Sequence, residues 1–231
     1  MFEDLQIPSD IERVYIDVGL NHTAPHSLNW LESDSKGFVF GFEPVKENCE
    51  RVLDEIKSRG FGDRFKLYQC AVDNVEGETI KDFYVTSYSN DGTIDQGQSS
   101  LFKFTQPENE TLVRIKEVVP TKCVNLTDLL KVLDWDRFKE ISCLKTDTQG
   151  NDLNILKSIE SYFDQIPLVY CEAHCFNQYE NVPYNPNSVY DYMTTNGYRI
   201  FNCGVADADH YYMRDSTMVQ ETLNRTWKRL S

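Results

Sequence analysis

The first residues that could carry chemistry lie where an apolar run meets a glycine turn. The run VYIDV, whose fourth residue is Asp17, is followed by Gly19 and Asn21, and Pro25 then opens a helical pattern. A second apolar run, FVFGFE, ends on Glu43. A carboxylate at the end of the second strand of a βαβ unit can accept hydrogen bonds from both hydroxyls of a ribose. The spacing therefore predicts a ribose-binding site beside the turn.

The turn lacks the second and third glycines that make room for a pyrophosphate in dinucleotide-binding proteins. Asn21 and Thr23 stand at those places. Their bulk, together with the carboxylate of Asp17, favours a ligand that carries an amino group and no phosphate. S-adenosyl-L-methionine has this chemistry, with adenine, ribose, an ammonium, a carboxylate and a sulfonium. A plain strand-to-helix turn is the alternative for these residues alone, and Glu43 shifts the balance towards a cofactor site.

Acids and a histidine follow two later apolar runs. Asp147 ends ISCLKTD, Glu172 ends LVYCE, and His174 comes shortly after. Parallel strands end at one rim of a sheet, so we expect these side chains to converge with the turn. His174, or Asp147 if its pKa is raised, could then remove a proton from a hydroxyl acceptor, and Glu172 is a further candidate. Helix capping by Asp147 and a plain loop role for His174 are the alternatives. Asp152 could join them in holding Mg²⁺, but the spacing does not require a metal and none is predicted.

The elements that must position these residues alternate along the chain. Apolar runs between helical patterns are typical of a mostly parallel sheet with helices on both faces. Seven runs predict strands, at 14–18, 38–43, 65–72, 141–147, 168–172, 198–202 and 210–214. Helical patterns follow Pro25 and occupy 44–60, 126–135, 151–163 and 187–197. In the 126–135 helix, Thr127 or Asp128 is the expected cap.

The middle of the chain departs from this order. Residues 75–124 contain turn signals and short alternating runs without a long helical pattern, which predicts a β-rich insertion. Within it, residues 87–111 are polar and contain glycines, which predicts a flexible loop over the acceptor site. The chain is nevertheless expected to form one domain over 1–231.

Composition argues against several classes of function. The net charge of −14 disfavours nucleic acid and anionic membrane surfaces as partners. No apolar run approaches the roughly 18 residues that a membrane span needs, and the acidic N-terminus does not resemble a signal peptide. Seven scattered cysteines without a C-x-x-C pair indicate buried thiols in a reducing cytoplasm rather than disulfides or a zinc site.

Several motifs occur in an order and spacing that resemble those of the FkbM-type methyltransferases. They are YIDVGLNHTAPHS, FGFEP, CAVDNVEGETIKDFYV, SSL, VNLTDLL, CLKTDTQGNDLNILKSI and VYCEAH, and the resemblance covers about residues 12–203. The most specific is LKTDTQGNDLNILKS, which is similar to the family's Lys-Ile-Asp-(Val)-(Glu/Gln)-Gly-x-Glu pattern. Asp152 stands where the family commonly has glutamate, and GLNHTAPHS departs from the usual Gly-Ala-Asn-x-Gly turn.

This resemblance implies a class I methyltransferase, Rossmann-like α/β fold with a central seven-stranded sheet. The implied reaction is transfer of a methyl group from S-adenosyl-L-methionine, often to a hydroxyl on a sugar, glycan or small natural product. The residues expected around the methionine part are Asp17, Gly19, Asn21 and Ser27. Glu43 is expected at the ribose, Ala71 and Val72 at the adenine, and Asp147 at the reacting centre.

Two rival functions remain at this point. A nicotinamide-dependent oxidoreductase shares the βαβ start and the acid after the second strand, but the missing glycines disfavour it. A non-catalytic nucleotide-binding module of the same fold would not require Asp17, Glu43 and Asp147 together. The sequence does not identify the methyl acceptor or the oligomeric state.

Overall fold

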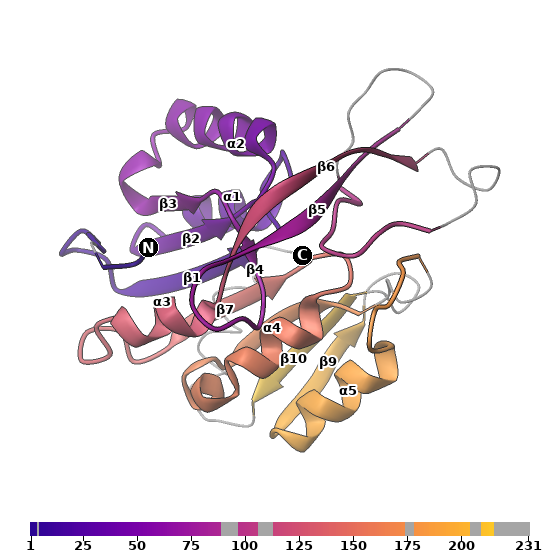
Figure 1. Cartoon of the computed structure of the whole chain (residues 1–231). Coiled ribbons are helices and arrows are strands. Elements are labelled where there is room, and N and C mark those ends of the chain that lie inside the picture. The colour runs from indigo at the N-terminus through magenta and orange to yellow at the C-terminus, as the bar shows by residue number, and fades with distance from the viewer. Residues whose placement is uncertain (4, 89–96, 106–112, 174–177, 204–208, 215–231) are drawn as a thin grey trace.

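The computed structural model describes residues 1–3, 5–88, 97–105, 113–173, 178–203 and 209–214 (Figure 1). Within them, the central sheet has seven strands in the order β3-β2-β1-β7-β8-β10-β9. These strands are β1 (Arg13–Val18), β2 (Gly37–Phe42), β3 (Phe65–Tyr68), β7 (Ile141–Thr146), β8 (Leu168–Glu172), β9 (Tyr198–Cys203) and β10 (Asp209–Arg214). Strands β3, β2, β1, β7 and β8 pair in parallel, and β10 runs antiparallel between β8 and β9. The predicted mostly parallel seven-stranded sheet is confirmed.

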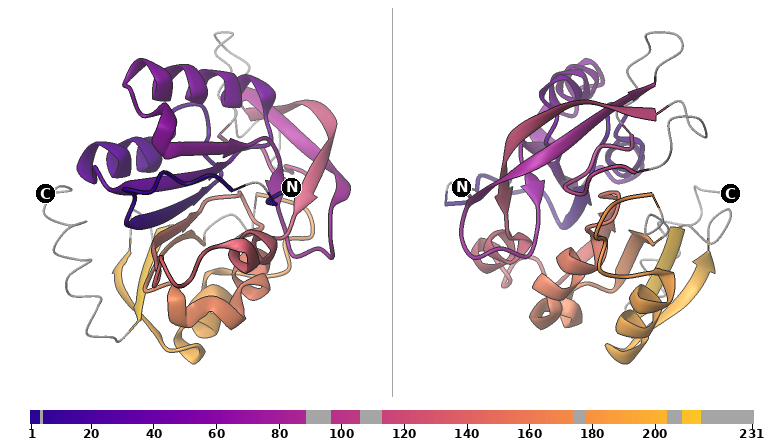
Figure 2. Two further views of the ribbon diagram at one scale, coloured as in Figure 1. Left: turned by 90° about the vertical axis from the view of Figure 1, so that its left-hand side faces the viewer. Right: turned by 45° about the vertical axis from the view of Figure 1, so that its right-hand side comes forward.

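Helices join the strands and cover both faces of the sheet (Figures 1 and 2). They are α1 (Pro25–Ser33), α2 (Lys46–Ser58), α3 (Leu126–Val132), α4 (Asp152–Ser158) and α5 (Pro186–Thr195), with short 3₁₀ helices at Gly62–Arg64 and Glu160–Gln165. Pro25 occupies the first turn of α1, where its missing N–H costs nothing. Helix α3 begins at Leu126 as predicted, but its expected cap was wrong, because the cap is Asn125, whose side chain accepts from the N–H of Thr127.

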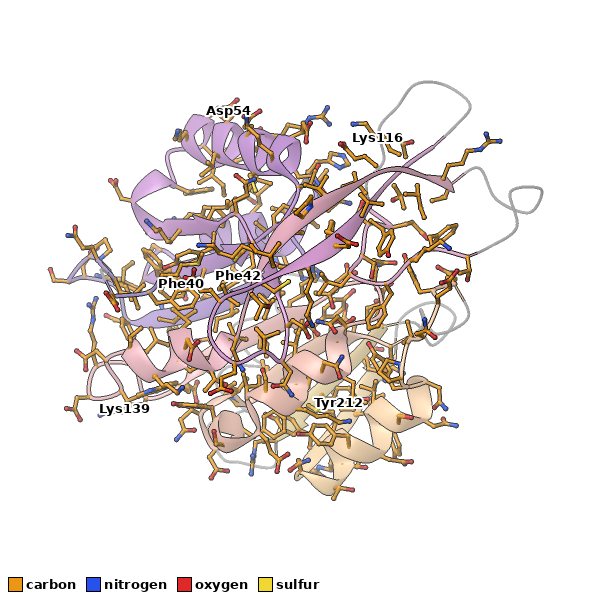
Figure 3. All side chains as sticks on the ribbon, viewed as in Figure 1. Phe40, Phe42, Asp54, Lys116, Lys139 and Tyr212 are labelled. Atoms are coloured by element: carbon orange, nitrogen blue, oxygen red, sulfur yellow. The ribbon has the colours of Figure 1, made fainter. Side chains whose placement is uncertain are left out.

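Side chains that alternate along the strands fill two separate cores. Val14 and Ile16 of β1 pack with α3, α4 and α5, while Tyr15 packs with α1 and α2 on the opposite face. This alternation follows from the two-residue repeat of a strand. A strand buried on both faces has a nearly continuous apolar sequence, which explains the runs in β1, β2 and β7. Figure 3 shows Phe40 and Phe42 of β2 among the packed side chains in the middle of the molecule.

The insertion forms a second, three-stranded sheet. Its strands are β4 (Ala71–Val72), β5 (Thr79–Tyr88) and β6 (Val113–Val124), in the order β4-β6-β5. Strands β5 and β6 make a long antiparallel ribbon that is conspicuous in Figures 1 and 2. The predicted strand 65–72 is divided, because β3 belongs to the central sheet and β4 pairs with β6. The β-rich character of the insertion is confirmed.

The predicted flexible loop, 87–111, falls partly outside the described residues. Residues 97–105 are described and make specific contacts. Ser100 exchanges backbone hydrogen bonds with Tyr84 of β5, and its hydroxyl donates to the carbonyl of Gln149 at 2.7 Å. Phe104 forms a β-bridge with Tyr179. This part of the insertion is therefore joined to the segment after β7 and to the segment that contains Tyr179, and the mobility of the loop stays a prediction.

Candidate active site

Gly19 brings the turn after β1 against the end of β7. Its φ is +81°, and a Cβ at this position would lie 1.9 Å from the carbonyl oxygen of Asp147. Glycine alone permits this approach. Asn21 has a φ of 54° and donates its N–H to Glu43 at 2.9 Å. Asparagine tolerates left-handed backbone better than most residues, so the turn needs a single glycine, at the point of contact with β7.

Asp17 lies beneath the turn. Its side chain is buried, and Oδ2 accepts from the N–H of Ser27 at 3.1 Å and from the Ser27 hydroxyl at 2.6 Å. These bonds fix the first turn of α1 to the end of β1. Neither Asp17 nor Ser27 lines the cavity described below. Both were predicted to surround the methionine part of the cofactor, and the structure places them under the backbone of the turn.

A buried lysine ties the ends of β1 and β7 together. Lys145 Nζ lies 3.3 Å from Asp17 Oδ1 and 3.6 Å from Asp147 Oδ2, and it donates to the carbonyl of Gly19. Burial alone would lower the pKa of Lys145, but the charges of Asp17 and Asp147 raise it above its ordinary value. The lysine is therefore charged and neutralises part of the acid at this rim.

Glu43 follows β2 at the predicted place. One carboxylate oxygen accepts from the N–H of Val45 at 2.9 Å and from Asn48 Nδ2 at 3.3 Å, and the other accepts from the N–H of Asn21. Only 4% of the residue is exposed. Burial raises the pKa of Glu43 to about 7, although these hydrogen bonds and the charge of Lys145 act in the opposite direction. A carboxylate offers about four acceptor positions, so lone-pair capacity remains for a ligand hydroxyl.

A pocket that is partly open to solvent lies beside Glu43, at the carboxyl ends of β1, β2 and β7. Polar side chains at its wall include Asn21, Glu43 and Asp147. Its apolar lining residues include Phe42, Ala71, Val72, Phe83 and Leu101. Apolar walls suit an adenine ring, and carboxylates suit ribose hydroxyls and cationic groups, so the residues present fit S-adenosyl-L-methionine.

Asp147 is the acid most open to the cavity, with 35% of its side chain exposed. Gln149 Nε2 donates to Asp147 Oδ1 at 3.0 Å and to Glu172 Oε2 at 2.6 Å. Burial alone would raise the pKa of Asp147, but Lys145 and the hydrogen bonds from Glu172 and Gln149 lower it. Asp147 is thus ionised at neutral pH, and the raised pKa that was expected of Asp147 as a base is not found. Glu172 lies behind Gln149 and does not line the cavity.

The first turn of α4 is held by Asp152. Its carboxylate accepts from the N–H of Thr148 at 3.3 Å and from the Thr148 hydroxyl at 3.0 Å. Burial and then the charge of Asp147 raise the pKa of Asp152 to about 6. The side chain of Asp147 bonds instead to Gln149, so the alternative role for Asp147 as the cap of this helix receives no support from these contacts.

Other candidates have different positions. His174 lies outside the described residues. His26 of α1 packs on Tyr170, with ring centroids 4.7 Å apart. Sequence reasoning missed Asn151, which lines the cavity and donates to the carbonyl of Val72 and to Asp73, each at 3.0 Å. Among the residues described, no group of three or more His, Cys, Asp or Glu side chains is arranged to hold a metal ion.

Comparisons with solved structures find distant similarities to methyltransferases. No curated protein matches the chain. The SAH-bound methyltransferase PaMTH1 of Podospora anserina aligns with 89% of this chain and 72% of its own, at 13% identity and a TM-score of 0.47. Sp1610 of Streptococcus pneumoniae, in complex with S-adenosyl-L-methionine, aligns with 89% of this chain at 8% identity and a TM-score of 0.44. The alignment covers 65% of Sp1610, so this chain spans slightly less than two thirds of that protein.

The family match is more specific than these similarities. The model of the methyltransferase FkbM domain matches residues 17–200, from Asp17 at the end of β1 to Ile200 in β9. The matched region includes Gly19, Glu43 and Asp147, which meet at the cavity. The strand order, the cavity and this match lead to one conclusion: the chain belongs to the FkbM methyltransferase domain family, whose members use S-adenosyl-L-methionine.

Proposed function

We propose that the protein transfers the methyl group of S-adenosyl-L-methionine to a hydroxyl oxygen of a small polyhydroxylated acceptor, such as a sugar, a glycan or a natural product. The observation that carries this proposal is the Asp147 carboxylate, which is ionised and partly exposed in the cavity. The cofactor supplies an activated methyl carbon, and the protein aligns the acceptor oxygen with it. Asp147 then accepts the proton that the hydroxyl loses.

Residues around the cavity have distinct roles in this proposal. Glu43 binds the ribose, and the apolar side chains of Ala71 and Val72 contact the adenine. Gly19 and Asn21 present the backbone of the turn to the methionine part, while Asp17 and Ser27 support that backbone from below. His174 assists Asp147 from the segment after β8.

The net charge and the cysteines indicate which binding partners and which cellular compartment suit this protein. The net charge of −14 makes nucleic acid and anionic membranes poor partners, and favours a neutral or cationic acceptor. In the described part of the chain, no helix is long and apolar enough to cross a bilayer. The cysteines resolved there, Cys49, Cys70, Cys123, Cys143 and Cys171, are buried free thiols, which suits the reducing cytoplasm that we propose as the compartment.

The test is an untargeted search for the acceptor. The protein is incubated with S-adenosyl-L-methionine carrying a labelled methyl group and with panels of glycans, polyhydroxylated natural products or cell extract. We expect the label in a product whose new methyl is bound to oxygen, and we expect its formation to depend on Asp147. A labelled product methylated on nitrogen or carbon would contradict the proposal of O-methylation.

A further inference from the structure

Three acidic residues lie at adjacent positions of the sheet where β7 and β8 end and β10 begins. Thr146 of β7 pairs with Cys171 of β8, so the next residues, Asp147 and Glu172, follow in register. Asp209 of β10 pairs directly with Glu172 on its other side. Like charges at adjacent positions of a sheet destabilise it. The ionised forms of these three acids would therefore repel one another.

Gln149 lies between two of these acids. Its Nε2 group donates to Asp147 at 3.0 Å and to Glu172 at 2.6 Å, so one amide serves both carboxyl groups. Its Oε1 accepts from the hydroxyl of Tyr179 at 3.0 Å, and its backbone carbonyl accepts from Ser100. The bond to Tyr179 sets the orientation of the amide, with the donor end towards the acids.

The backbone around Gln149 supports this placement. Its φ is 55°, in the left-handed region, and its side chain is buried. A non-glycine residue in this conformation is strained and persists only where its surroundings hold it there. Contacts from two other segments, through Ser100 and Tyr179, do so here. Gln149 is consequently fixed in a position from which its amide bridges Asp147 and Glu172.

We propose that Asp147, Gln149 and Glu172 act as one proton-accepting unit, in which Asp147 removes the proton of the acceptor hydroxyl, Glu172 shares it, and Gln149 is the positioning residue. This proposal rests on the proposed O-methylation and deepens it. As the oxygen–carbon bond forms, the carbon–sulfur bond breaks and its electron pair goes to sulfur. The hydroxyl proton goes to the Asp147 carboxylate and is then held between the two carboxyl groups.

The physical basis is the coupling between neighbouring acids. Two carboxyl groups that share a site bind protons in two separated steps, which belong to the pair rather than to either residue. The carboxyl groups of Asp147 and Glu172 are joined through the amide of Gln149, which donates to both. The other charged or titratable groups that face the pair are Lys145 of β7, Asp17 of β1, His26 of α1, Asp152 of α4 and Asp209 of β10.

The direct test is a carboxyl ¹³C NMR titration of the full chain without cofactor. In the wild type, we expect the signals of Asp147 and Glu172 each to respond in two steps. In Glu172→Gln, the Asp147 signal should titrate in a single step whose midpoint differs by about one pH unit or more, and Asp147→Asn should change Glu172 in the same way. Asp34, at the opposite end of the sheet, serves as the internal control and should not change. Independent single-step titrations that ignore the partner's replacement would overturn the proposal.

Gln149→Met tests the bridge itself. Loss of a donor shared by two carboxylates should move the titration of the pair to higher pH by about one unit, because the ionised forms lose their hydrogen bonds. An unchanged titration in a folded Gln149→Met protein would show that Gln149 does not set the pair. Calorimetry with S-adenosyl-L-methionine accompanies each titration, so failure of cofactor binding, which concerns the proposed function, is distinguished from failure of the coupling.

Turnover provides a second readout with an identified acceptor. Glu172→Gln should lower kcat by about tenfold or more, as expected for impaired proton transfer, with KM little changed. Glu172→Asp should recover part of this loss. Equal loss in both variants, with an unchanged pH profile, would assign Glu172 a structural role only and contradict the proposal.

Discussion

Asp34 at one end of the central sheet and Glu43 at the other have pKa values that are shifted in opposite directions. At the amino end of β1 and β2, Asp34 accepts from the guanidinium of Arg13 through both oxygens and also from the hydroxyl of Tyr15. Burial alone would raise the pKa of Asp34, but these donors and the N–H of Lys36 lower it. At the carboxyl end, burial dominates for Glu43, whose pKa is raised to about 7.

This difference distinguishes a carboxylate that stabilises the fold from carboxylates that remain available to bind a ligand. Asp34 has a guanidinium partner, and its ionised form stabilises the folded state. At the other end, Lys145 is shared by Asp17 and Asp147, while Glu43 and Asp152 bond mainly to uncharged groups. An excess of negative charge in a partly closed cavity costs stability, and a cationic ligand such as a sulfonium compensates it.

The largest expected effect is on turnover. Asp147→Asn should lower the rate of methyl transfer about 10²–10⁴-fold, the usual contribution of a general base. Cofactor affinity should be nearly unchanged, because the ribose and methionine contacts lie elsewhere in the cavity. Asp34→Asn is the matched control and should retain turnover per folded molecule. Full activity of Asp147→Asn on the identified acceptor would move the base to Glu172 or His174.

The next largest effect concerns the turn. Gly19→Ala places a methyl group 1.9 Å from the Asp147 carbonyl oxygen, so the turn must move away from β7. We expect a loss of about 3 kcal/mol or more in the free energy of unfolding, measured by urea denaturation. Gly60→Ala is the control, because Gly60 also has a positive φ, of +77°, but open space at its Cβ. Equal losses in the two variants would show that the contact with β7 does not matter.

The pH dependence of stability should have opposite signs at the two ends. The folded-state pKa of Glu43, about 7, lies above its ordinary value of 4.5, so its favourable contribution is full below about pH 4.5 and is lost as the pH rises through 7. Glu43→Gln should therefore gain up to about 3 kcal/mol relative to the wild type between pH 4.5 and pH 8.

Asp34 gives the reverse result. Its folded-state pKa lies below its ordinary value of 3.8, so its contribution is present above that pH and is lost as the pH falls through the folded-state pKa. Asp34→Asn should thus lose most stability, relative to the wild type, at neutral pH. Denaturant midpoints measured across this pH range check both variants. If the stability of both variants, relative to the wild type, changed with pH in the same direction, the contrast between Asp34 and Glu43 would be contradicted.

The smallest effect is expected at the insertion. Tyr179→Phe removes a hydroxyl whose single proton is shared between Gln149 Oε1 and the carbonyl of Gln98, at a cost of about 0.5–1.5 kcal/mol. Amide exchange at Ser100 should become faster, while exchange in the core strand β1 should not change. If residues 87–111 also form the predicted flap, exchange in that loop should slow when cofactor and acceptor bind. Strong protection throughout the loop without ligand would contradict the flap.

Residues next to a strand end were the ones that the sequence could predict. Gly19, Glu43 and Asp147 each follow an apolar run that is easily recognised in the sequence. Parallel strands end at one rim of the sheet, so the order of the strands along the chain predicts that these three residues meet at the cavity. Asp17 also belongs to such a run, but it is one residue before the strand end. The two-residue repeat turns its side chain towards α1, where it bonds to Ser27.

The positions of the other residues depend on contacts between segments that are far apart in the sequence. Asp209 lies beside Glu172 because β10 inserts antiparallel between β8 and β9. No local sequence pattern determines the register of this pairing. Gln149 owes its place to a left-handed backbone and to Tyr179, thirty positions along the chain. Division of the run 65–72 between two sheets likewise depends on the pairing of β4 with β6.

Cofactor binding to matched variants of the two ends tests the central claim most directly. Isothermal titration with S-adenosyl-L-methionine, at a pH where Glu43 is ionised, is carried out on the wild type, Glu43→Gln and Asp34→Asn. We predict a loss of about 1–3 kcal/mol in binding free energy for Glu43→Gln, because charge-assisted hydrogen bonds to the ribose are weakened. Asp34→Asn should bind like the wild type. Undiminished affinity in Glu43→Gln, or an equal loss in both variants, would contradict the assignment of the carboxyl end of the sheet as the cofactor site.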